Sequence, residues 1–194
     1  MPQNVILVGS EGHCKTTVAA ALARALDTKL PQNLFTSETA STINLAIADK
    51  TFAVTHCTSH EEIKQTLSST STKFTTAVLV VSVIDGVQTH TRDHIELCEK
   101  HGVRGINVWL NMYDMVGAGD VEFVDMLEEE ITELLGEKGY ETENIFVIGR
   151  GSALKALQGE AGDVESIKEL LSRNQLYVDS KFRRQPVSGI DLES

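Results

Sequence analysis

The chain has 194 residues, of which 41% are hydrophobic and 23% are charged, and its formal net charge is −11. This composition is typical of one globular domain with a sizeable core, and the negative charge argues against extensive direct binding of DNA. No long apolar run predicts a membrane span, and the N-terminus has no signal-peptide pattern. Because the three cysteines are scattered, we expect reduced thiols and a cytoplasmic location. Because no apolar run is long enough to span a bilayer, we expect no membrane partner.

Strand and helix patterns alternate along the chain, which predicts an α/β fold with a mostly parallel sheet. The expected strands are Val5–Val8, a hairpin of Thr42–Ile47 and Thr51–Thr55, then Ala77–Ile84, Gly105–Leu110 and Ile145–Ile148. The expected helices are Thr16–Leu26, Ser59–Leu67, Thr91–His101, an acidic amphipathic helix capped by Asp120, and Asp163–Leu171. We interpret the acidic face as solvated, with a docking surface as the alternative. Residues 1–174 are predicted to form the domain and residues 175–194 a polar tail.

The stretch Val5–Thr17 contains the parts of a phosphate-binding loop. A short β-branched strand ends at Gly9, and Lys15 and Thr16 open a helix. In such a loop, backbone N–H groups cradle phosphate, the Lys meets the outer phosphates and the Thr hydroxyl reaches Mg²⁺. The pattern G-x-x-x-x-G-K-[ST] is incomplete here, because Cys14 stands at the second Gly position.

Three later stretches carry a resemblance to a known family. They are Asp85–Ile95 with its Asp-Gly and Thr-Arg-Asp-His-Ile strings, Leu110–Val116, and Gly151–Leu157. In this order they resemble the GTP-binding domain of bacterial elongation factor Tu, a translational GTPase, over about residues 3–180. The resemblance implies a P-loop, small-GTPase-like three-layer fold with a six-stranded, mostly parallel sheet, and it implies GTP or GDP and Mg²⁺ as ligands.

The base-reading residues that the resemblance implies are largely kept. The N-K-x-D motif of the family is similar to Asn111-Met112-Tyr113-Asp114, in which Asp114 would accept from two guanine nitrogens and Asn111 would tie the loop to neighbouring backbone. A Lys of the family is replaced by Met112. The family segment whose backbone N–H contacts the guanine oxygen is matched by Ser152, Ala153 and Leu154.

The residues implied for phosphate and Mg²⁺ are less well kept. The resemblance places Gly9, His13, Lys15, Thr16, Thr17 and Thr42 around the phosphates, with Thr16 and Thr42 as Mg²⁺ ligands. Gly12 stands where the family has an Asp. Cys14 occupies a Gly position that is expected to need an unusual backbone conformation, which would cost about 1–3 kcal/mol. The segment before Thr42 is shorter than in typical family members.

The D-x-P-G-H motif of the family, which serves Mg²⁺ and the attacking water, is matched by residues 56–60. His60 corresponds to the catalytic His, whereas His56 replaces the Asp, Thr58 the Pro and Ser59 the Gly. An imidazole suits Mg²⁺ poorly, and a side chain at position 59 restricts the peptide there. Because phosphoryl transfer depends on positioning and electrostatic stabilisation, we expect a weakened Mg²⁺ site and slower GTP hydrolysis more than weaker diphosphate binding.

Two other functions stay open at this point. One is a pseudo-GTPase, a protein-interaction module without nucleotide whose partner would be the ribosome or an exchange factor by family resemblance. We do not expect tRNA delivery, because the two β-barrel domains that help elongation factor Tu grip aminoacyl-tRNA are not in this sequence. The other is a metal or redox site that includes Cys14 and His56. His90, His94 and His101 are expected to be surface or packing residues.

Overall fold

The computed structural model describes residues 2–30, 34, 40–69, 71–117, 119–140 and 145–182, with backbone alone for residues 145–147 and 173–182. Its strands are β1 (Gln3–Val8), β2 (Ser41–Ile47), β3 (Lys50–His56), β4 (Thr76–Ser82), β5 (Gly105–Asn111) and β6 (Ile145–Arg150). They form one six-stranded sheet in the order β2-β3-β1-β4-β5-β6. Only β2 is antiparallel to its neighbour, so the predicted mostly parallel sheet is confirmed.

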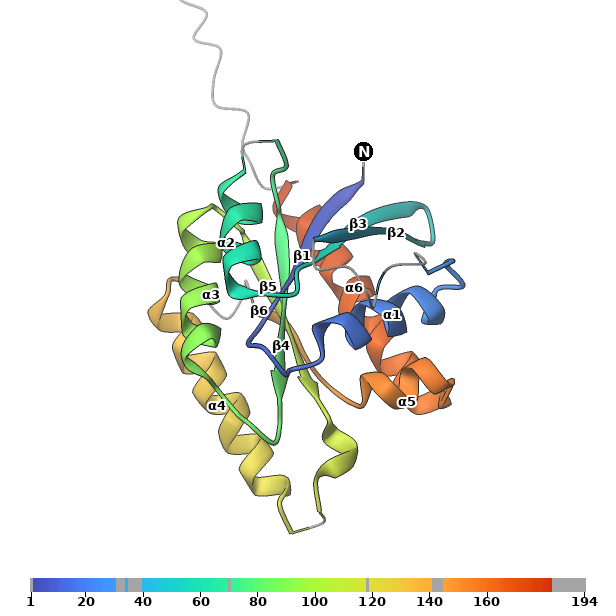
Figure 1. Ribbon diagram of the computed structural model, residues 1–194, viewed down its shortest axis with the longest axis vertical. Coiled ribbons are helices and arrows are strands. Elements are labelled where there is room, and N and C mark those ends of the chain that lie inside the picture. Colours follow the sequence, from blue (N-terminus) through green and yellow to red (C-terminus); the bar gives the residue numbers. More distant parts are fainter. Residues whose placement is uncertain are drawn as a thin grey trace, which may run out of the picture.

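Helices cover both faces of the sheet and make three layers (Figure 1). The helices are α1 (Lys15–Ala25), α2 (His60–Ser68), α3 (Thr89–Lys100), α4 (Val121–Glu137), α5 (Ala153–Gln158) and α6 (Ala161–Phe182), with a short 3-10 helix η1 (Tyr113–Met115). One core cluster contains buried residues of α1, α5 and α6, and the other contains those of α2, α3 and α4.

The apolar runs of β1 and β4 explain why two cores can share one sheet. Along β1, Val5 and Leu7 belong to the core with α1, whereas Ile6 and Val8 belong to the core with α4. All seven residues of β4 are buried. Successive side chains of a strand point to opposite faces, so a strand covered on both sides must be apolar at nearly every position.

Several element predictions are confirmed and others need correction. The hairpin is present, since β2 and β3 pair along their length. Asp120 does precede α4, but its side chain makes no capping hydrogen bond. The helix α5 was not predicted, and α6 continues to Phe182, beyond the predicted end at Leu171 and into the segment predicted as a tail. Between α1 and β2, residues 31–33 and 35–39 lie outside the described residues.

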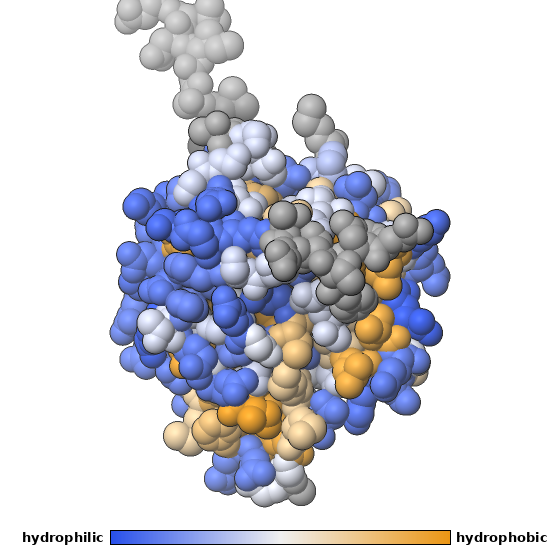
Figure 2. All heavy atoms as spheres, in the orientation of Figure 1, coloured by the Kyte–Doolittle hydropathy of each residue, from blue (hydrophilic) through white to orange (hydrophobic). Residues whose placement is uncertain are grey.

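The surface over α2 and α3 is hydrophilic in the view of Figure 2, where it forms the left side of the molecule, whereas α4 carries the exposed apolar residues Phe123 and Met126. On α4, Glu122, Asp125, Glu129 and Glu133 are exposed. Asp125 and Glu128 form ion pairs with Arg150, the last residue of β6, at 2.6 and 2.5 Å. The acidic face is therefore partly neutralised within the domain. Within the described part of the chain, no helix combines the length and apolarity needed to cross a membrane.

Candidate nucleotide site

The predicted site residues gather where the parallel strands end. The phosphate loop follows β1, His56 ends β3, the 82–85 segment follows β4, Asn111 ends β5, and Ser152 follows β6. In open α/β sheets, ligands bind at the carboxyl ends of the strands, where the connecting loops meet. The fold thus brings residues from distant parts of the sequence to one edge of the sheet.

Two residues of the phosphate loop have unusual backbone geometry. Gly9 has φ 139°, and a Cβ built there would lie 2.2 Å from the carbonyl oxygen of Val80, so only Gly fits. Cys14 has φ 61° and ψ 37°, in the left-handed region. The prediction of an unusual conformation at position 14 is confirmed. An L-residue pays about 1–2 kcal/mol for this conformation.

Lys15 lies against its own loop. Its ammonium donates to the carbonyl oxygens of Gly9 and Ser10 at 2.9 and 3.0 Å, and the residue is only 6% exposed. Burial lowers the pKa of this ammonium, while the nearby Glu11 raises it. The charge sits within the loop that is expected to receive phosphate.

Asn111 joins the phosphate loop to the segment after β6. Its amide nitrogen donates to the carbonyl oxygen of His13 at 3.3 Å, and its amide oxygen accepts from the backbone N–H of Ala153 at 3.0 Å. The indole of Trp109 donates to the same oxygen at 3.3 Å. The predicted role of Asn111 in tying the loop to neighbouring backbone is confirmed.

Asp114 lies in η1 and is exposed, with no hydrogen bond to any described residue. Met112 precedes η1 in the left-handed region with φ 63°, and its sulfur accepts a 3.5 Å contact from the Ser82 hydroxyl. The carboxylate of Asp114 is therefore available to a base, and the thioether that replaces the family's Lys packs on the end of β4.

The 152–154 segment begins α5. Ser152 caps the helix, with its Oγ accepting from the N–H of Lys155, and its own N–H donates to Asp163 at 2.7 Å. Since Asn111 takes the N–H of Ala153, the N–H of Leu154 is the donor of this segment without a partner among the described residues.

The expected Mg²⁺ end is occupied by protein contacts. The Thr16 hydroxyl is 2.7 Å from Nε2 of His56, and the Thr42 hydroxyl is 3.0 Å from that of Thr55. His56 is fully buried, its Nδ1 has no partner among the described residues, and burial followed by the charge of Lys15 lowers its pKa. A neutral imidazole stands where oxygen ligands are needed, so these residues do not fit an ordinary Mg²⁺ site.

His60 opens α2 and is held by α3. Ser59 caps α2 by accepting from the N–H of Glu62, and His60 Nδ1 is 3.0 Å from Nε2 of His94. His94 is 1% exposed, and its Nδ1 accepts from the N–H of Gly9 at 3.2 Å. Burial, followed by the neighbouring His60, lowers the pKa of His94 to about 3. The predicted catalytic His is thus linked to the phosphate loop through a neutral His94.

The burial agrees with the expectation that His90 and His94 are surface or packing residues, since His90 is exposed and His94 is buried, and both also contact residues of the site. His94 bonds two site residues, and His90 stacks on His60 with ring centroids 4.6 Å apart. The sequence contains one signal that His94 is buried. This residue lies four residues before the apolar Cys98 and therefore on the same face of the helix. No sequence signal placed α2 beside the first turn of α3.

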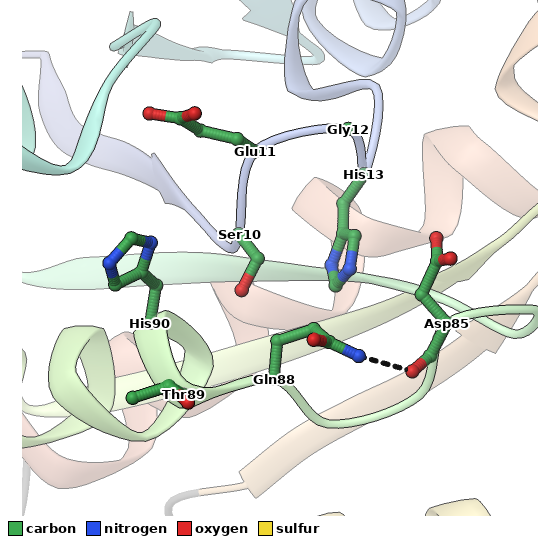
Figure 3. Close-up of a pocket in the computed structure, with 8 residues that line it drawn as sticks. All are labelled: Ser10, Glu11, Gly12, His13, Asp85, Gln88, Thr89 and His90. Atoms are coloured by element: carbon green, nitrogen blue, oxygen red, sulfur yellow. Dashed lines mark hydrogen bonds between the residues drawn. The ribbon is translucent and has the colours of Figure 1, made fainter.

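A hollow of about 510 Å³ separates the phosphate loop from the start of α3 (Figure 3). It is lined by Ser10, Glu11, Gly12, His13, Asp85, Gln88, Thr89 and His90. The Ser10 hydroxyl also lies 3.0 Å from that of Thr91, so the loop and α3 are bonded across it. None of the base-reading residues lines this hollow.

A family model described as the elongation factor Tu GTP binding domain matches residues 32–180. The chain belongs to this family. It is a GTP-binding domain of the elongation factor Tu type, with guanine nucleotide as the ligand that the family implies. The matched range contains the base-reading residues and His60 but begins after the phosphate loop. The assignment of residues 9–17 as a phosphate loop therefore rests on their geometry alone.

The predicted alternative of a metal site with Cys14 and His56 is not supported by the geometry. Cys14 Sγ faces the carbonyl oxygen of Gly12, and His56 faces Thr16. Among the described residues, neither belongs to a group of three or more metal-ligand side chains.

Proposed function

We propose that this elongation factor Tu-type domain binds guanine nucleotide, with GDP as the favoured ligand, and that it hydrolyses GTP slowly. The observation that carries this proposal is the 2.7 Å contact between the Thr16 hydroxyl and Nε2 of His56. In the family this hydroxyl serves Mg²⁺, whose charge helps to stabilise phosphoryl transfer. Here a buried imidazole takes the hydroxyl instead.

The base end supports guanine as the recognised base. Asp114 offers two carboxylate oxygens to the N1–H and the amino group of guanine, and the N–H of Leu154 offers a donor to the guanine oxygen. Adenine presents neither the N1–H nor that oxygen. Asn111 fixes the spacing between the base-reading segments and the phosphate loop.

The phosphate loop supports binding of a diphosphate. Gly9 and Cys14 keep the backbone turn that precedes α1, and Lys15, Thr16 and Thr17 remain at the start of that helix. A helix N-terminus with a buried ammonium attracts an anion. The Lys15 ammonium uses two of its three N–H donors on the carbonyl oxygens of Gly9 and Ser10, so one donor remains for a phosphate.

The water-activating end supports slow hydrolysis. His60 is bonded to His94, and Ser59 is committed to capping α2, so neither is free to follow a terminal phosphate without breaking a hydrogen bond. Thr42 is bonded to Thr55 within the hairpin. Each lost positioning group lowers the rate, because the protein contributes mainly positioning and charge to this reaction.

Isothermal titration calorimetry with GDP, in Mg²⁺ and in EDTA, tests the binding half. The expected result is a dissociation constant of about 1 μM or tighter that changes little when Mg²⁺ is removed. Single-turnover cleavage of radiolabelled GTP tests the other half, with slow cleavage expected in saturating Mg²⁺. Binding that collapses in EDTA, or cleavage at the rate of an intact elongation factor Tu measured beside it, contradicts the proposal.

A second candidate function is a pseudo-GTPase that binds a protein partner without nucleotide. The contacts of three phosphate-end residues favour this function. The hydroxyls of Thr16 and Thr42 and the ammonium of Lys15 all have hydrogen-bond partners within the protein, so the fold does not need a nucleotide to satisfy them. By family resemblance its partner would be the ribosome or an exchange factor. Silent calorimetry with both GDP and GTP selects this function over the first.

A further inference from the structure

The first turns of α2 and α3 bring together three metal-ligand side chains, of which only His60 also belongs to the water-activating end of the nucleotide site. His60 is the first residue of α2, and His90 and Asp93 lie three residues apart on α3, so they share one face of that helix. One ligand atom from each of the three side chains lies within 4.8 Å of the other two. No other group of this kind occurs among the described residues.

The chemistry of this group fits zinc. Two imidazoles and one carboxylate are the ligand set of zinc sites that keep a position open for water or another ligand. With bonds of about 2.0–2.1 Å in a tetrahedral arrangement, ligand atoms sit about 3.4 Å apart. Because His90 is exposed and stacks only on His60, a change of its rotamer can close the remaining gap. Mg²⁺ is a poor candidate because it prefers oxygen ligands.

The hydrogen bonds around His60 define what zinc would change. The N–H of Gly9 donates to Nδ1 of His94, so neutral His94 carries its proton on Nε2 and donates it to Nδ1 of His60. Neutral His60 then carries its own proton on Nε2, the nitrogen without a hydrogen bond among the described residues. This chain of three groups runs from the phosphate loop to the first turn of α2.

We propose that His60, His90 and Asp93 form a zinc site joining α2 to α3, and that zinc binding is transmitted through His94 to the phosphate loop. Zinc takes Nε2 of His60, so the proton of that ring moves to Nδ1 and is donated to Nε2 of His94. His94 then carries its proton on Nδ1, where it faces the N–H of Gly9. Two donors cannot share a hydrogen bond, and the Gly9–His94 bond is lost. His94 is the positioning residue of this site, and the proposal does not depend on nucleotide binding.

Zinc affinity tests the first part of the proposal. Protein purified without a polyhistidine tag and stripped with a chelator is titrated with Zn²⁺ against a chromophoric competitor. We expect one zinc per chain with a dissociation constant of about 1 μM or tighter. His90→Gln and Asp93→Asn should each weaken binding at least about 10-fold, since even the loss of a group that only supports a ligand costs 10–100-fold. His101→Gln, which changes a histidine just after α3, should leave binding unchanged.

Absorption of the Co²⁺ form gives an independent readout, with intense visible bands expected from a four- or five-coordinate site and absent in His90→Gln. Stoichiometry below one, or equal zinc affinity in His90→Gln and the parent protein, overturns the site. Both variants change side chains on one turn at the start of α3, and thermal unfolding shows whether they remain folded.

The tautomer of His94 tests the second part. Long-range ¹⁵N–¹H spectra distinguish the Nε2–H and Nδ1–H forms of a neutral imidazole, and zinc is expected to move His94 from the first to the second. Hydrogen exchange of the Gly9 amide should quicken at least about 10-fold in the same titration, because the amide loses its acceptor. Zinc binding with an unchanged His94 tautomer and unchanged Gly9 exchange overturns the transmission while leaving the site intact.

Discussion

The base-reading end and the metal end of the nucleotide site differ in how their polar groups are satisfied. At the base-reading end, the amide of Asn111 is used to join loops, while the carboxylate of Asp114 is exposed and has no partner among the described residues. At the metal end, the hydroxyls of Thr16 and Thr42 both have protein partners. A base can therefore bind without disturbing a protein hydrogen bond, whereas a metal ion at these hydroxyls has to share them with His56 and Thr55.

This difference has an energetic consequence. A hydrogen bond within a protein contributes about 0.5–1.5 kcal/mol net, so each contact that a ligand must replace subtracts about that much from its binding free energy. At the metal end, replacing the contact between Thr16 and His56 would also place a divalent cation next to the buried imidazole of His56. Under the proposed function, the domain is expected to recognise the base and the diphosphate more readily than the metal ion and the terminal phosphate.

The largest expected effect comes from breaking the base-reading end. Asp114→Asn should weaken GDP binding about 100-fold, because an amide offers one acceptor and one donor where guanine needs two acceptors. The same variant should gain affinity for xanthosine diphosphate, whose carbonyl replaces the amino group. Calorimetry with both nucleotides measures the exchange. Asp120→Asn, a nearby exposed carboxylate, is the matched control, and equal GDP affinity in both variants would remove Asp114 from the site.

Restoring an oxygen ligand should sharpen the contrast at the metal end. His56→Asp places a carboxylate beside the Thr16 hydroxyl and Lys15, and it should raise the ratio of GDP affinities in Mg²⁺ and EDTA by about 10-fold. His56→Asn removes the imidazole without adding charge and is the matched control. If the two variants give the same ratio, the residue at position 56 does not limit Mg²⁺ binding.

A pH effect is expected at His13, whose backbone carbonyl connects the two ends. Its imidazole is buried and donates from Nδ1 to the carbonyl of Val80, and burial lowers its pKa below 6.5. Below pH 6.5 the unfolded chain therefore binds a proton that the folded chain refuses. The free energy of unfolding should be insensitive to this group above pH 6.5 and fall by up to about 1.4 kcal/mol per pH unit below it.

Urea unfolding at pH 7.5, 6.5 and 5.5 measures that slope. His13→Gln should reduce this slope by up to about 1.4 kcal/mol per pH unit and leave the part that the buried His56 and His94 contribute, while His101→Gln should not change it. An unchanged slope in His13→Gln would mean that this imidazole is protonated in the folded protein, and the neutral state assigned to it in the loop would then be wrong.

The smallest expected effect concerns Cys14 in the phosphate loop. Cys14→Gly should raise the free energy of unfolding by about 1 kcal/mol, because Gly adopts the left-handed conformation without the penalty of an L-residue. For a domain of this size that is about 2–4 °C in Tm. Cys14→Ala removes the thiol but keeps the Cβ and is the control. Equal Tm values for the two variants would show that the backbone at position 14 stores no strain.

Much of the fold could be predicted from the sequence, and the reasons are visible in particular elements. The buried runs of β1 and β4 and the hairpin of β2 and β3 follow from apolarity and spacing. The end of α6 was missed because its polar residues after Leu171 suggest a tail, and α5 because six residues give too short a periodic signal. The left-handed conformation at Cys14 was predictable because the motif has Gly there.

The contacts that define the candidate site were less accessible. Which side chain Thr16 meets depends on the register of β3 beside β1, where His56 pairs with Leu7, and no local pattern encodes that register. The stacking of His60 on His90 depends on how α2 packs against α3. Sequence patterns identify such residues as chemically interesting, but only tertiary packing selects their partners.

The geometry around Gly9 also governs which substitutions the phosphate loop can accept. At position 9, any side chain would meet the Val80 carbonyl oxygen of the adjacent strand, so the barrier to substitution is a collision with backbone. At Gly12, φ is 83° and no atom lies within 4 Å of a built Cβ, so the only barrier to a side chain is the unfavourable backbone torsion. Cys14 already has a side chain at a positive φ, which shows that the fold tolerates such a torsion. Side chains can therefore be accommodated at positions 12 and 14 at a torsional cost, whereas at position 9 the backbone of β4 excludes them, and this fixes the turn out of β1.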